Sequence, residues 1–169
     1  MRILSLDPGL ERIGFAVLQK EGSRLAALDY GLIETPRIDL PSRLLLIHER
    51  LTEIIQTHRP DVAAIEKLLF AVNKTTAMDV AKASGVLILT CRQAGLDVHE
   101  ITPPEVKQAV VGNGAADKKQ VQFMVTKLLA LRETPKPDDV ADALAIGIAH
   151  AFRAPVSSAI GKMGQIGLK

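Results

Sequence analysis

Tryptophan is absent from the sequence, and only one tyrosine and four phenylalanines are present, although 47% of the 169 residues are hydrophobic. A core must therefore be built mainly from leucine, isoleucine, valine and alanine. The single cysteine, Cys91, excludes an internal disulfide. Its place in an apolar helical stretch predicts a buried thiol. Such sparse cysteine use fits a reducing, cytoplasmic environment.

Long apolar runs are also missing. No stretch reaches the roughly 18 uninterrupted apolar residues that a membrane-spanning helix needs. Asp7 interrupts the only candidate for a signal sequence, so no targeting segment is expected. The net charge is only +2 and the isoelectric point about 8.8. This balance permits a nucleic-acid partner without requiring one, because the distribution of charge matters more than its sum.

The length favours a single domain, which we expect over residues 1–154. Residues 155–169 contain Gly161, Gly164 and Gly167 and show no hydrophobic periodicity. They are expected to form a mobile C-terminal tail. No internal repeat or low-complexity block is visible.

Hydrophobic periodicity predicts an α/β protein. The predicted strands cover residues 2–7, 13–18, 25–33, 61–66 and 98–101; the predicted helices cover residues 41–59, 73–94, a short stretch from 103, 121–131 and 138–151. Residues 112–119 are interpreted as a flexible connection. The first three strands follow one another closely and predict an antiparallel meander. We therefore expect a five-stranded mixed sheet with helices on both faces.

Two of the predicted strands finish on an acid. Asp7 ends the first, directly before Pro8 and Gly9, and Glu66 ends the fourth. If these strands are parallel neighbours, both carboxylates emerge at the same end of the sheet. Like charges at close range raise each other's pKa unless a cation holds them, so the pairing favours a divalent metal.

A third acidic group opens the last helix. Asp139 and Asp142 are three residues apart and share one helical face, whereas Asp138 points elsewhere and is expected to cap the helix. Oxygen ligands without cysteine or suitably spaced histidine suit Mg²⁺ or Mn²⁺ rather than zinc. Two such ions about 4 Å apart can hydrolyse a phosphodiester without a protein nucleophile. The pattern therefore indicates a nuclease.

Simpler explanations exist for each acid taken alone. Asp7 could be an ordinary turn residue, Glu66 could pair with Lys67 at the surface, and acids are favoured in the first turn of any helix. These explanations leave Asp142 unaccounted for, because it interrupts an apolar helical face where burying a charge is costly.

Five blocks of sequence together resemble the RuvC family of bacterial Holliday-junction resolvases. They run in order along residues 1–152. The blocks are Leu6-Asp7-Pro8-Gly9 with Gly14, Ile65-Glu66-Lys67-Leu68, Thr102-Pro103 with Val106-Lys107-Gln108-Ala109-Val110, Ala116-Asp117-Lys118 with Gln120-Val121-Gln122, and Asp139-Val140-Ala141-Asp142-Ala143-Leu144-Ala145.

The resemblance implies a ribonuclease H-like fold and a homodimer that nicks two opposed strands of four-way junction DNA in recombination and repair. It also implies two Mg²⁺ ions per active site, with Mn²⁺ able to substitute, and the branch-migration proteins RuvA and RuvB as partners. By the same resemblance the catalytic, metal-binding acids are Asp7, Glu66, Asp139 and Asp142. Lys107 and Lys118 match basic positions that contact DNA or support catalysis in the family, and Phe70 is a candidate to stack on a base. Where this sequence departs from the family, DNA contact is expected to shift to other basic residues, such as Lys74, Lys82 or Lys119.

Phe70 is the one aromatic residue in a stretch where the family commonly has two. It could stack on an opened base or belong to the core. Two other functions stay open: a ribonuclease H-like nuclease for another branched or hybrid nucleic acid, and a junction-binding protein without catalysis. An actin-like nucleotide-binding fold is disfavoured because no glycine-rich phosphate loop follows the first strand.

Overall fold

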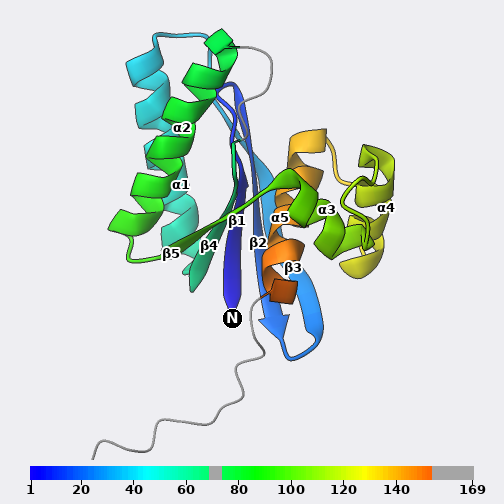
Figure 1. The fold of residues 1–169 in the computed structure, drawn as a ribbon. Helices are drawn as coiled ribbons and strands as arrows, with labels where there is room; N and C mark the ends of the chain where they lie inside the picture. The colour runs from blue at the N-terminus through cyan, green and yellow to red at the C-terminus, as the bar shows by residue number, and fades with distance from the viewer. Residues whose placement is uncertain (69–73, 154–169) are drawn as a thin grey trace, which may run out of the picture.

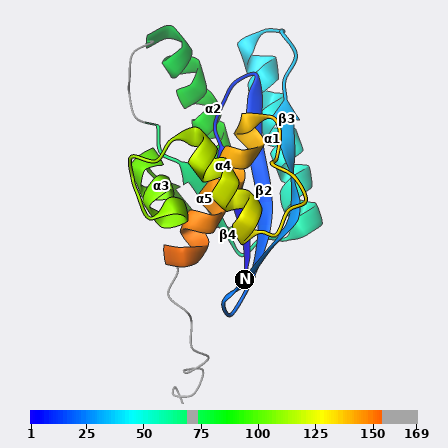
Figure 2. The ribbon, with the colours of Figure 1, turned by 90° about the vertical axis from the view of Figure 1, so that its right-hand side faces the viewer.

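The computed structural model describes residues 1–68 and 74–153 as a mixed sheet between two helical layers (Figure 1). The strands are β1 (Arg2–Asp7), β2 (Arg12–Glu21), β3 (Arg24–Glu34), β4 (Val62–Glu66) and β5 (Asp97–Ile101). The helices are α1 (Leu40–His58), α2 (Lys74–Gln93), α3 (Pro103–Val111), α4 (Lys118–Leu128) and α5 (Asp138–Arg153). Helices α1 and α2 cover one face, and α5 covers the other with α3 and α4 outside it (Figures 1 and 2). The expected tail and Phe70 lie outside the described residues.

The strand order is β3-β2-β1-β4-β5. β1 pairs antiparallel with β2, and β2 with β3, which confirms the predicted meander. β1 and β4 are parallel neighbours in which Leu6 lies opposite Ile65. Asp7 and Glu66 follow these two residues, so the register brings both acids to the same end of adjacent strands. The five-stranded mixed sheet and the helices on both faces are as predicted.

Burial on both faces explains why β1 is an almost continuous apolar run. Successive strand residues point to opposite faces. Leu4 and Leu6 belong to the core beneath α1 and α2, while Ile3 belongs to the core around α5. Asp7 has the parity of Ile3 and therefore faces α5. On β4, Val62 and Ala64 also belong to the α5 core, so Glu66 faces the same side.

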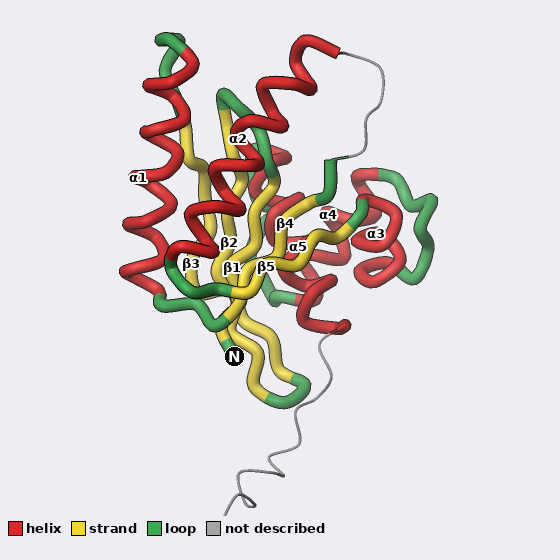
Figure 3. The backbone as a smooth tube through the Cα atoms, turned by 60° about the vertical axis from the view of Figure 1, so that its left-hand side comes forward, coloured by secondary structure: helices red, strands yellow, loops and turns green. Residues whose placement is uncertain are grey.

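The α1–α2 layer, seen from its own side in Figure 3, agrees with the sequence pattern. The small residues of α2 were expected to allow close packing, and Ala83 and Ser84 are indeed buried there. Cys91 is fully buried, as predicted, and burial raises the pKa of its thiol to about 12. Gly95 follows α2 with a φ of 81°, a left-handed conformation that suits glycine after a helix. Within the described part of the chain, the helices are too short or too polar to traverse a bilayer.

The boundaries differ from the predictions most clearly at α4 and at the turn between β2 and β3. α4 begins at Lys118, so the last two residues of the predicted connection are helical. The reason is a capping box, in which the Asp117 carboxylate accepts from the Gln120 N–H and the Gln120 side chain accepts from the Asp117 N–H, each at 2.9 Å. β2 also continues to Glu21, and β3 already begins at Arg24. The two strands are joined by a tight turn in which Gly22 has a φ of 58°.

Helix α5 approaches the sheet unusually closely at Gly14. A Cβ atom at this position would lie 1.9 Å from the carbonyl oxygen of Asp139. Gly14 is the residue opposite Asp7 in the β1–β2 ladder. The absence of a side chain at Gly14 therefore lets the first turn of α5 come down beside Asp7.

Gly14→Ala should lower the melting temperature, because the clash involves backbone atoms and overpacking of this kind costs about 1–3 kcal/mol. Gly85→Ala is the matched control: a Cβ there meets nothing within 4 Å, and alanine in a helix interior should stabilise by about 0.5–1 kcal/mol. Thermal unfolding measures both. A Gly14→Ala protein as stable as the unmodified chain would contradict the close approach of α5.

Candidate active site

Four carboxylates gather where β1 and β4 end beneath the start of α5. Asp7 and Glu66 come from the strands, and Asp139 and Asp142 come from the first two turns of the helix. Burial raises the pKa of Asp7 from 3.8 to about 8, assisted by repulsion from Glu66, Asp142 and Asp139 in that order. Each of the other three acids therefore lies near enough to act electrostatically on Asp7.

Burial is also the main cause of the raised pKa values of Glu66 and Asp142. Neither helix acid is fully enclosed, because the side chains of Asp139 and Asp142 are 26% and 33% exposed. Asp142 therefore does not point into the apolar interior, although it interrupts the apolar face of α5. It stands at the border of the core, where a ligand from solvent can reach it.

Lys118 is the cation that offsets this negative charge most directly. Its Nζ lies 3.1 Å from a carboxylate oxygen of Asp142 and 3.1 Å from one of Asp138. Burial alone would lower the pKa of Lys118, but the hydrogen bonds to these two carboxylates outweigh it and raise the pKa. The capping box at Asp117 starts α4 at Lys118 and so helps to place this side chain.

A cleft of about 210 Å³ opens beside the acids. It is lined by Glu66, Pro103, Val106, Lys107, Lys118, Val121, Asp142 and Ala145. Lys107 comes from α3, and its charge acts to lower the pKa of Glu66. The cleft therefore places two carboxylates opposite two ammonium groups, a combination that suits a metal-dependent reaction on a phosphate.

On the other side of the acids, Arg12 pairs with Asp139. Arg12 Nη2 lies 3.3 Å from Asp139 Oδ2, yet this buried oxygen receives no hydrogen bond from any residue that the structure describes. Arg12 was not among the predicted site residues. One feature of the sequence could have located this residue. A tight hairpin that pairs residue 7 with residue 14 puts Arg12 at the start of β2, close to the end of β1.

The remaining predicted residues are more scattered. Lys119 borders a separate hollow with Asp117, Gln120 and Phe123, away from the cleft lining. Lys74 begins α2. The cap expected from Asp138 is corrected: its carboxylate accepts from Gln122 Nε2 at 2.9 Å and pairs with Lys118, so it faces α4.

Comparison with known proteins identifies the family. The model of the family "Crossover junction endodeoxyribonuclease RuvC" matches residues 3–150. The chain belongs to the RuvC family. It is 52% identical over 159 residues to RuvC of Brevibacillus brevis, covering 93% of this chain and 96% of that one. It is 50% identical over 151 residues to RuvC of Halothermothrix orenii, covering 89% and 92%.

Comparison with solved structures points to the same family. The Thermus thermophilus RuvC structure superposes with a TM-score of 0.83 at 35% identity, covering 90% of this chain and 94% of that one. The same protein in complex with a Holliday junction substrate gives a TM-score of 0.85 at 34% identity, covering 90% and 93%. The expected ribonuclease H-like fold and nuclease class of this RuvC-family chain are thereby confirmed.

The acids of this RuvC-family chain are near one another without forming a closed coordination shell. Across residues 1–68 and 74–153, no group of three or more histidine, cysteine, aspartate or glutamate side chains is arranged to hold a metal ion. Two of the acids are paired with cations instead: Asp142 with Lys118 and Asp139 with Arg12. The donor set nevertheless fits a hard cation, since it consists of carboxylates and includes Asp139 Oδ2, a buried oxygen that accepts no hydrogen bond from the described residues.

Asp7 should make the metal-free protein less stable as the pH rises. Its folded-state pKa of about 8 lies above the ordinary 3.8, so between these values the folded state holds a proton that the unfolded state has lost. In EDTA, urea unfolding should show a free energy of unfolding that falls between pH 5 and pH 8. Asp7→Asn should reduce this fall by on the order of 1–3 kcal/mol. An unchanged pH slope in the variant would contradict the raised pKa.

Proposed function

We propose that this chain resolves four-way DNA junctions by metal-dependent phosphodiester hydrolysis at the four gathered acids. The observation that carries the proposal is the convergence of Asp7, Glu66, Asp139 and Asp142 beside a cleft that also contains Lys107 and Lys118. Family membership and the junction complex of the Thermus thermophilus relative support the choice of substrate. We assign the nuclease domain to residues 1–154 and leave residues 155–169 outside it.

Asp7, Glu66, Asp139 and Asp142 are the residues that would hold Mg²⁺, or Mn²⁺ in its place. When bound, two such ions supply an activated water and charge stabilisation at the leaving oxygen. The protein's own part is to hold the carboxylates on two strands and a helix at the edge of the cleft. Lys107 and Lys118 would neutralise the phosphate that enters the cleft.

DNA contacts beyond the cleft are proposed at Lys119, Lys74 and Phe70. Lys119 is well placed to touch the backbone of a DNA arm, since it lies one residue from Lys118 on α4. A homodimer is proposed because a junction with two-fold symmetry is matched by two identical sites. Cooperation with RuvA and RuvB, and a cytoplasmic location, follow from the same family role.

Asp7→Asn is expected to leave junction binding within about threefold of the unmodified protein and to reduce cleavage by at least about 100-fold, because it removes a charged ligand without changing shape. Gel shift in EDTA measures binding, and cleavage of a labelled junction in Mg²⁺ measures activity. Asp97→Asn is the control, since Asp97 begins β5 and pairs with Arg92 at the surface. Cleavage by Asp7→Asn at the unmodified rate would refute the assignment of the metal site.

Neighbouring lysines on α4 allow a sharper test of the cleft. Lys118→Gln should lower the cleavage rate at saturating junction by about 10- to 100-fold, because an ammonium facing the acids is lost. Lys119→Gln should leave that rate nearly unchanged but weaken binding and reduce the slope of log affinity against log salt by about 1. Single-turnover cleavage and salt-dependent gel shifts separate the two effects. If the two variants have the same cleavage rate and the same salt dependence of binding, the proposed difference in role between Lys118 and Lys119 is refuted.

A further inference from the structure

The loop between β1 and β2 joins two residues of the candidate active site. It follows Asp7 directly and leads into Arg12, whose guanidinium lies beside the carboxylate of Asp139. The turn is tight at Gly9, where a Cβ atom would lie 2.0 Å from the Arg12 carbonyl oxygen. A change in the path of this loop would therefore move Arg12 relative to Asp139.

Packing does not hold this loop from every side. A cavity of about 450 Å³ lies against it and is lined by Gly9, Leu10, Glu11, Arg12, Arg43, Asp79, Val80 and Asp139. A loop that borders such an open space needs directional bonds to keep one conformation. Those bonds come from residues that follow it much later in the chain.

Thr35, directly after β3, binds the loop at two consecutive carbonyl groups. Its backbone N–H donates to the Glu11 carbonyl oxygen at 3.0 Å, and its hydroxyl donates to the Leu10 carbonyl oxygen at 2.6 Å. The residue is only 7% exposed, so water competes little for these bonds. Thr35 thus fixes the segment immediately before Arg12.

Arg43 of α1 orients Thr35 in turn. Its Nε donates to the Thr35 hydroxyl oxygen at 2.9 Å, which leaves the hydroxyl hydrogen free for Leu10. Arg43 is 9% exposed, and its Nη2 has no hydrogen-bond partner among the described residues. A buried guanidinium with an unpaired nitrogen is costly, and an apolar side chain would fill the same space without that cost. Core packing alone therefore does not account for arginine at this position.

We propose that Thr35 and Arg43 are positioning residues for cleavage: through the loop of residues 8–11 they hold Arg12 beside Asp139 and so keep the Asp139 carboxylate ready for a divalent cation. This inference rests on the proposed function. The ion pair between Arg12 Nη2 and Asp139 Oδ2, 3.3 Å apart, supports it, because no described residue donates a hydrogen bond to this buried oxygen and Arg12 is the charged group that lies against it. Residues that orient a metal ligand without touching the metal themselves commonly change metal affinity by about 10- to 100-fold when they are mutated.

The test is Thr35→Val, which removes the hydroxyl and keeps the shape, compared with Thr35→Ser, which retains the hydroxyl. The Mg²⁺ concentration for half-maximal junction cleavage should rise about 10-fold in Thr35→Val and return to within about twofold in Thr35→Ser. Junction binding in EDTA should be unchanged in both. Arg43→Met removes the hydrogen bond that orients Thr35 and should also raise the Mg²⁺ requirement. Combining Arg43→Met with Thr35→Val should raise it no further, because Arg43 acts through Thr35.

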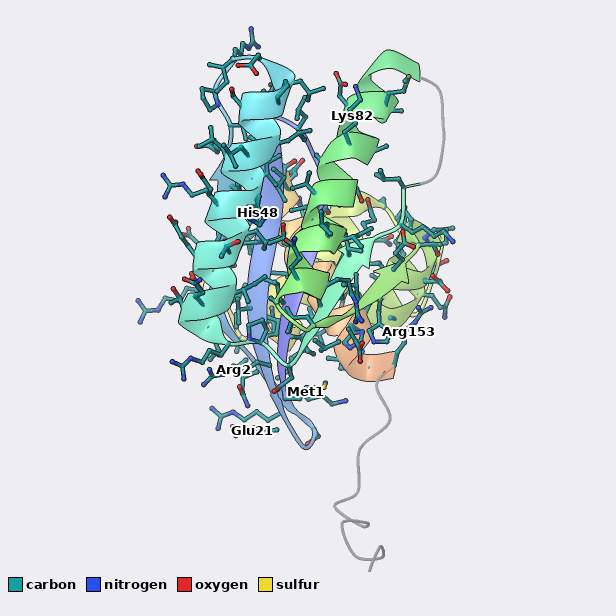
Figure 4. All side chains as sticks on the ribbon, turned by 90° about the vertical axis from the view of Figure 1, so that its left-hand side faces the viewer. Met1, Arg2, Glu21, His48, Lys82 and Arg153 are labelled. Atoms are coloured by element: carbon teal, nitrogen blue, oxygen red, sulfur yellow. The ribbon has the colours of Figure 1, made fainter. Side chains whose placement is uncertain are left out.

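Thr90→Val is the matched control for loss of a buried threonine hydroxyl. Thr90 is 2% exposed, donates to the Val86 carbonyl oxygen at 2.8 Å and lies 2.9 Å from His48 Nδ1. His48 is in the middle of the α1–α2 layer (Figure 4), which lies on the opposite face of the sheet from α5. Thr90→Val should lower the melting temperature without changing the Mg²⁺ requirement.

The outcomes separate this inference from the proposed function. If the unmodified chain cleaves junctions and both Thr35→Val and Arg43→Met keep its Mg²⁺ requirement, losing only thermal stability as Thr90→Val does, the positioning role is refuted and the function stands. If one variant does not fold, the other decides the result. A chain that cleaves no junction in Mg²⁺ or Mn²⁺ would overturn both.

Discussion

Four carboxylates repel one another at the end of β1, and the surrounding structure is arranged to tolerate that repulsion. Burial and three neighbouring acids raise the pKa of Asp7 to about 8. Lys118 and Arg12 offset part of the negative charge from opposite sides. A fold carries such a cluster at a cost to its own stability. The cost is understandable where a divalent cation is bound during function.

Strand parity and close packing bring the acids together. Asp7 and Glu66 end adjacent parallel strands and face the same side of the sheet, which follows from the pairing of Leu6 with Ile65. Gly14 then lets α5 descend beside Asp7, so that acids at the start of this helix arrive over those of the strands. The same architecture leaves α1 and α2 on the far face, where Arg43 anchors the loop behind the site.

The sequence predicted the acids well because their signals are local: a short apolar strand ending on a carboxylate, and acids three residues apart on a helix. The start of α4 was also local, but the Asp117–Gln120 capping box was overlooked. Arg12, Thr35 and Arg43 were not predicted, since their partners depend on a hairpin, a strand end and a helix meeting in space. Nor do the acids alone reveal the ion pairs of Asp142 with Lys118 and of Asp139 with Arg12.

The most direct test of the metal site is the location of Mn²⁺ by anomalous scattering from crystals of the unmodified chain. Strong Mn²⁺ peaks are expected among Asp7, Glu66, Asp139 and Asp142, with Asp142 released from Lys118. Mn²⁺ bound only elsewhere, or Asp142 remaining on Lys118 at saturating Mn²⁺, would contradict the proposed metal site.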